Sequence, residues 1–171
     1  MPVLHTCLLS AFTCLLLWAA YSDVRRFEIP NAIPLVLLGL YPLFAAASPG
    51  PAHPLTTLLV AVASFVGGAG LFAAGLMGGG DVKLFAAAAL WVGPAKCIDF
   101  LTLTALAGGV FALILLTGRV LLTERGRALL ARVSTLPSSP PGPLPAFRRP
   151  MPYGVAITAA AIAIVLPPNL T

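Results

Sequence analysis

Long apolar runs alternate along the chain with short polar breaks or with breaks rich in proline and glycine. A helix needs about 20 mostly apolar residues to cross a bilayer, and six runs approach this length. The segment between the fifth and sixth runs, residues 119–150, is long and polar and contains a proline-rich stretch. The pattern predicts an all-α, polytopic membrane protein whose six transmembrane helices cover about residues 3–21, 29–47, 55–77, 82–95, 98–118 and 151–166.

Composition supports a membrane protein. Of the 171 residues, 59% are hydrophobic and only 9% are charged, and the mean hydropathy is +1.00. Soluble domains carry roughly 25% charged residues. Six spans leave little chain for a separate soluble domain, so residues 1–171 are expected to form one integral-membrane domain.

The net charge of +5 could indicate a nucleic-acid partner, but the positions of the basic residues explain it otherwise. Nine of the ten lysines and arginines fall on one side of the predicted topology, and Lys96 alone falls on the other. Basic loops face the cytoplasm. The loop 119–150 is therefore predicted to be cytoplasmic, both termini are predicted on the opposite side, and no nucleic-acid partner is needed.

Two of the five carboxylates stand out by position. Asp99, Glu124 and Glu28 are expected at surfaces or among arginines, whereas Asp23 follows the first span and Asp81 opens the fourth. Both aspartates are predicted at the cytoplasmic face. The fourth span is short, rising about 21 Å against a hydrocarbon core of about 30 Å. Either the bilayer thins locally, or Asp81 and Lys83 lie below the inner surface in a wet cavity.

Ionisable groups at such depth are costly and mark function by default. A simpler interpretation makes Asp81 the N-cap of a helix and Lys83 a snorkelling anchor. If the two aspartates meet, they share a proton, which provides a base to activate water and an acid to protonate the scissile group. The glycines before Asp81 would let an extended substrate approach closely.

Three sequence segments carry a family resemblance. "GGGDVK" (78–83) resembles the G-x-G-D motif of the GxGD membrane aspartyl proteases, "SDVRRFEIPN" (22–31) resembles the other aspartate segment of the prepilin peptidases, and "MPYGVAI" (151–157) resembles their Pro-[Tyr/Phe]-Gly segment. The resemblance implies an endopeptidase of the bacterial inner membrane that removes the short basic leader of type IV prepilins at the cytoplasmic face. It assigns catalysis to Asp23 and Asp81, and supporting roles to Gly78, Gly80, Lys83, Pro30 and Asn31.

The cysteine pattern indicates which branch of the family the chain resembles. The larger family members carry a zinc-binding insert with two CxxC pairs and also methylate the new N-terminus, whereas Cys7, Cys14 and Cys97 form no such pair. No metal, no cofactor and no methyltransferase activity are therefore expected. Cys7, Cys14 and Cys97 are expected to be buried free thiols. The chain most resembles the short Flp or tight-adherence (Tad) branch, which implies a Flp-like prepilin and the lipid bilayer as partners.

Two alternatives from other classes stay open. A small proton-coupled transporter would use the same carboxylates as a relay, but both are predicted at one face. A non-catalytic membrane component of a pilus-assembly apparatus would tolerate the loss of either aspartate. Within 63–75, small residues at four-residue spacing, Ala63 with Gly67 and Gly70 with Ala74, predict close helix packing.

Overall fold

The computed structural model describes residues 2–48, 54–133 and 153–166, and the elements in these ranges are helices. No strand occurs among them, so the predicted all-α class is confirmed. The elements are α1 (Pro2–Arg26), α2 (Ala32–Ala47), α3 (Pro54–Ala73), α4 (Gly79–Val92), the short 3₁₀ helix η1 (Pro94–Lys96), α5 (Cys97–Val133) and α6 (Tyr153–Val165).

The chain divides into two compact units. The first contains residues 1–108 and 150–171, and the second contains residues 109–149. Helix α5 begins in the first unit and remains helical to Val133, beyond the predicted end of the fifth span at residue 118. The rest of the predicted loop, 134–150, lies outside the described residues.

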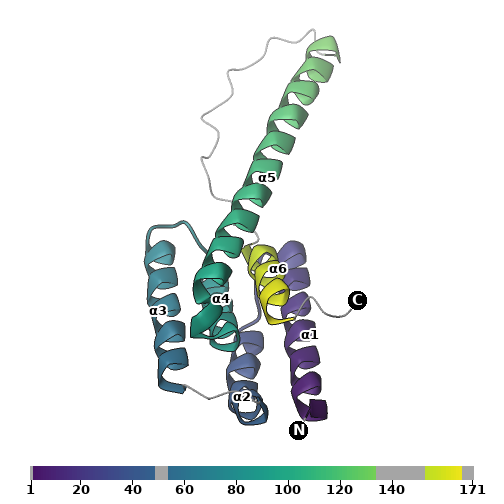
Figure 1. Ribbon diagram of the computed structural model, residues 1–171. Helices are drawn as coiled ribbons and strands as arrows, with labels where there is room; N and C mark the ends of the chain where they lie inside the picture. The colour runs from purple at the N-terminus through teal and green to yellow at the C-terminus, as the bar shows by residue number, and fades with distance from the viewer. Residues whose placement is uncertain (1, 49–53, 134–152, 167–171) are drawn as a thin grey trace. The chain divides into compact units, whose positions relative to one another are not determined.

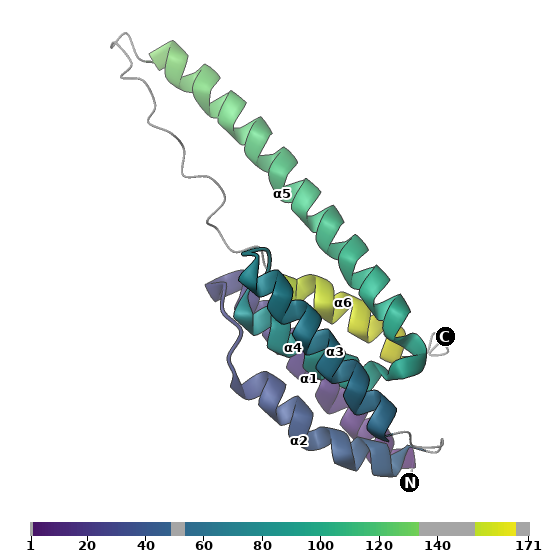
Figure 2. The ribbon, with the colours of Figure 1, turned by 90° about the vertical axis from the view of Figure 1, so that its left-hand side faces the viewer.

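Helix α4 is the centre of the first unit, where it packs against α2, α3 and α6, while α1 packs against α2 and α6 (Figure 1 and Figure 2). It is only 14 residues long, and every side chain from Asp81 to Trp91 except Lys83 is buried. The run Ala86–Ala89 explains how three neighbours fit around it, because small side chains let helix axes approach closely.

Helix α3 approaches α4 at Gly68. A Cβ atom at Gly68 would lie 2.9 Å from Val82 Cγ1, whereas one at Gly67 or Gly70 would meet no atom of the described residues within 4 Å. The sequence predicted that Ala63, Gly67 and Gly70 form the packing face of this helix. This was wrong, because all three are exposed. Four-residue spacing identifies a stripe of small residues but does not fix which way the helix is turned.

An aromatic cluster holds the far end of α4. Trp91 stacks on Phe12 of α1 with ring centroids 4.7 Å apart and on Phe44 of α2 at 4.6 Å. The Trp91 indole N–H donates to the Leu37 carbonyl at 3.0 Å. A buried indole N–H needs such a partner, so this contact also sets the rotation of α4 against α2.

The helices suit a lipid environment. Among the described residues, three helical segments are long and apolar enough to cross a membrane, and the apolar helices α2 and α6 are shorter. Large apolar side chains point outward, including Leu17, Leu58 and Val66, each more than half exposed. Soluble proteins rarely expose so much apolar surface. The chain is a multi-pass membrane protein, and the count of six spans remains a prediction. The three spanning segments are Val3–Arg26, Pro54–Ala73 and Pro94–Ile114.

Candidate active site

The predicted site residues lie where several helix ends of the first unit meet. The end of α1, the α1–α2 loop and the starts of α4 and α6 contribute to this region. The contacts described below join segments up to 131 residues apart in sequence.

Asp23 lies in the last turn of α1 and is only 3% exposed. Its Oδ2 accepts a hydrogen bond of 2.8 Å from the backbone N–H of Gly154, at the start of α6. Helix α1 ends three residues later, where Phe27 takes the left-handed conformation with φ 54° and its N–H donates to the Asp23 carbonyl at 2.9 Å. Such a residue is a common helix stop, and here it fixes Asp23 at the end of the helix.

Asp81 lies in the first turn of α4 and is 5% exposed. It is not the N-cap residue, as the simpler interpretation had it, because Gly78 holds that position. The Asp81 carboxylate instead reaches back to the Gly78 backbone amide, much as the third residue of a capping box does. Its Oδ1 is buried without a hydrogen-bond partner among the described residues.

The Gly154 amide and the two carboxylates are neighbours. The amide donates to Asp23 Oδ2, and Asp81 lies close enough to interact electrostatically with this amide and with the Asp23 carboxylate. The structure therefore brings together the two aspartates that the sequence singled out. Two carboxylates at such range hold one proton between them more readily than none.

Three glycines make this approach possible. A Cβ atom at Gly78 would lie 2.8 Å from Asp81 Oδ2, and one at Gly154 would lie 2.8 Å from Asp23 Oδ2. A Cβ atom at Gly80 would lie 3.1 Å from the Ile29 Cβ in the α1–α2 loop. Gly78 and Gly80 were expected as supporting residues. Gly154 was quoted only as part of a motif and was missed as a site residue.

The other expected supporting residues tie α4 to the α1–α2 loop. Lys83 Nζ donates to Asn31 Oδ1 at 2.9 Å. The Pro30 carbonyl accepts the Ile33 N–H at 3.1 Å and starts α2. Ser22, which sequence reasoning missed, donates from its hydroxyl to the Glu28 carbonyl at 2.8 Å.

Within the described part of the chain, no group of three or more His, Cys, Asp or Glu side chains could hold a metal ion. The three cysteines were expected to be buried. This was wrong for Cys7 and Cys14, which are exposed on α1, while Cys97 is half-buried. An apolar outward face on a membrane helix accommodates a thiol as readily as a core does.

Apolar helices packed around two buried aspartates define the class of this protein: it is a multi-pass membrane protein with a pair of carboxylates at one end of its helix bundle. The model of the type IV leader peptidase family matches residues 10–113, more than half of the chain, and the chain belongs to that family. The match includes Asp23 and Asp81 and excludes Gly154. Comparisons with curated proteins and with solved structures give no match.

Proposed function

We propose that this chain is an aspartic endopeptidase that removes the short basic leader of a type IV or Flp-like prepilin. Family membership supports a leader peptidase in general. The observation that carries the mechanism is the placement of Asp23 and Asp81 as buried neighbours, with the Gly154 amide donating to Asp23.

In the proposed reaction, the ionised aspartate takes a proton from water, whose oxygen attacks the scissile carbonyl. The protonated aspartate first hydrogen-bonds the carbonyl oxygen and then supplies a proton to the leaving amine. The Oδ1 of Asp81, which has no hydrogen-bond partner in the described part of the chain, is suited to hold the attacking water or the carbonyl. No metal is required, because both proton transfers run between the carboxyl groups and the reactants.

The supporting residues then act by positioning. Gly78 and Gly80 let α4 begin close to its neighbours. The Lys83–Asn31 hydrogen bond and Pro30 hold the α1–α2 loop beside α4. These contacts set the distance between the two carboxylates, and they do not touch the reacting atoms.

The sequence supports a more specific proposal for the membrane topology and for the branch of the family. The apolar runs support six spans, and the basic asymmetry of the loops supports the aspartates at the cytoplasmic face and 119–150 as a cytoplasmic loop. The resemblance to the prepilin peptidases supports a bacterial inner membrane. The absence of CxxC pairs in the sequence supports the Flp or Tad branch, without methyltransferase activity.

The test is cleavage of a purified Flp-like prepilin by the purified full chain, read as a mass shift of the product. Asp23→Asn and Asp81→Asn should each abolish cleavage, while Asp99→Asn, an exposed carboxylate outside the pair, should cleave like the wild type. Equal melting temperatures would show that the variants fold. Cleavage by both Asn variants would exclude the two aspartates from the reaction. A folded wild type that does not cleave the prepilin would instead favour a non-catalytic assembly component.

A further inference from the structure

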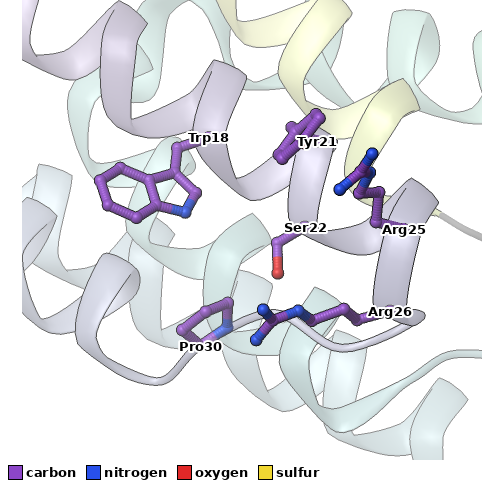
Figure 3. Close-up of a pocket in the computed structure, with 6 residues that line it drawn as sticks. All are labelled: Trp18, Tyr21, Ser22, Arg25, Arg26 and Pro30. Atoms are coloured by element: carbon purple, nitrogen blue, oxygen red, sulfur yellow. The ribbon is translucent and has the colours of Figure 1, made fainter.

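A pocket of about 600 Å³ opens beside the end of α1. Its lining residues are Trp18, Tyr21, Ser22, Arg25, Arg26 and Pro30, and they surround the Ser22 hydroxyl in Figure 3. Five of them come from the last turns of α1, at spacings of three and four residues that place them on one face of a helix. The proposed peptidase chemistry uses neither arginine.

The pocket has the charge for an anion. Two guanidinium groups flank it, and a guanidinium binds phosphate through paired N–H donors. Arg25 lies over the Tyr21 ring, with its guanidinium carbon 5.3 Å from the ring centroid, and this contact restricts the side chain. Glu28, the acid of the neighbouring loop, does not line the pocket.

The surroundings favour a lipid as the source of that anion. Trp18 and Tyr21 are 65% and 59% exposed, at the end of a helix long and apolar enough to span the membrane. Aromatic side chains of this kind lie at the headgroup level of a bilayer, and basic pockets at that level bind anionic headgroups. The apolar wall formed by Trp18 would then face acyl chains.

Ser22 adds selectivity. Its hydroxyl hydrogen is directed to the Glu28 carbonyl at 2.8 Å, so within the pocket the oxygen can act only as an acceptor. An acceptor beside two guanidiniums suits a headgroup that carries both a phosphate and a hydroxyl donor. We propose that this pocket binds the phosphodiester headgroup of an anionic phospholipid of the phosphatidylglycerol type.

The experiment compares spin-labelled phosphatidylglycerol with spin-labelled phosphatidylcholine on the full chain reconstituted in phosphatidylcholine vesicles. The wild type should bind the anionic label more tightly. Arg25→Gln/Arg26→Gln should reduce that preference by about fivefold or more. Both arginines are exposed, so the variant should fold, which an unchanged melting temperature would verify.

The matched control is Arg148→Gln/Arg149→Gln, which removes the same charge from the same predicted membrane side. It should leave most of the preference intact. An equal loss in both double variants would mean that anionic lipid is attracted to the basic face in general, and it would contradict binding in the pocket. A wild type without preference would overturn it as well.

Competition by excess inorganic phosphate distinguishes a lipid headgroup from free phosphate as the anion that the pocket binds. A lipid site should keep its bound label in the presence of phosphate, because Trp18 and the acyl chains add apolar contact. Displacement of the label by phosphate alone would contradict the lipid assignment and identify a site for free phosphate.

Discussion

At the scale of single residues, Gly154 controls the candidate site by having no side chain. Its amide reaches Asp23 Oδ2 at 2.8 Å, and a Cβ atom there would lie 2.8 Å from the same oxygen and 3.2 Å from the Asp23 Cβ. Any substitution must therefore displace either the start of α6 or the Asp23 carboxylate.

Gly154→Ala should lower the cleavage rate by roughly two orders of magnitude, because a displacement of about 1 Å at a reacting group can cost that much. The measurement is the single-turnover rate with a Flp-like prepilin. Gly67→Ala is the matched control and should keep the wild-type rate, since a Cβ atom at Gly67 meets nothing within 4 Å in the described structure. Full activity of the Gly154→Ala enzyme would show that cleavage does not depend on the close approach of the Gly154 amide to Asp23.

The residue scale also shows which site residues a sequence can reveal. Asp23 and Asp81 could be predicted because carboxylates are rare in so apolar a chain and both fall at one predicted membrane face. Gly154 and Ser22 could not be assigned, because their roles are contacts made by a backbone amide and by a hydroxyl. Such contacts depend on how α6 and the α1–α2 loop pack, which cannot be predicted from the composition of the chain.

At the scale of elements, α4 is short, alanine-rich and surrounded, so its neighbours fix its position. Its start is held by the Lys83–Asn31 hydrogen bond and its end by Trp91 on Phe12 and Phe44. Along its side, Gly68 of α3 touches Val82, next to Asp81. The apolar runs predicted that these helices exist, whereas their rotation had to come from packing.

Gly68→Val should destabilise the protein by about 1–3 kcal/mol, the usual cost of overpacking a tight contact. The measurement is the free energy of unfolding in mixed micelles. Gly67→Val introduces the same residue one position away, where no atom of the described ranges lies within 4 Å of the Cβ, and should cost much less. Equal losses in the two variants would mean that helix propensity, and not the α3–α4 contact, sets the effect.

At the scale of the whole molecule, the distribution of basic residues should orient the protein in its membrane. Nine of ten lysines and arginines fall on one predicted side, and basic loops stay in the cytoplasm. The predicted orientation places the loop holding Glu28 inside and the loop holding His53 outside.

Single cysteines report this orientation once Cys7, Cys14 and Cys97 are replaced by serine. A membrane-impermeant maleimide should label His53→Cys in intact spheroplasts and Glu28→Cys only after lysis. The reverse pattern would invert the topology and move the aspartates to the outer face. Labelling of both in intact spheroplasts would place the two loops on the same side and contradict the second predicted span.

The central claim is that Asp23 and Asp81 act as one catalytic unit, and a double-variant comparison tests it most directly. Groups that act together are far from additive when removed. The measurement is the single-turnover cleavage rate of Asp23→Asn, Asp81→Asn and the double variant. Each single change should lower the rate by at least about 10³, and the double variant should be no slower than the slower single variant. A single variant with the wild-type rate, or a double variant whose loss is the product of the two single losses, would contradict a shared site.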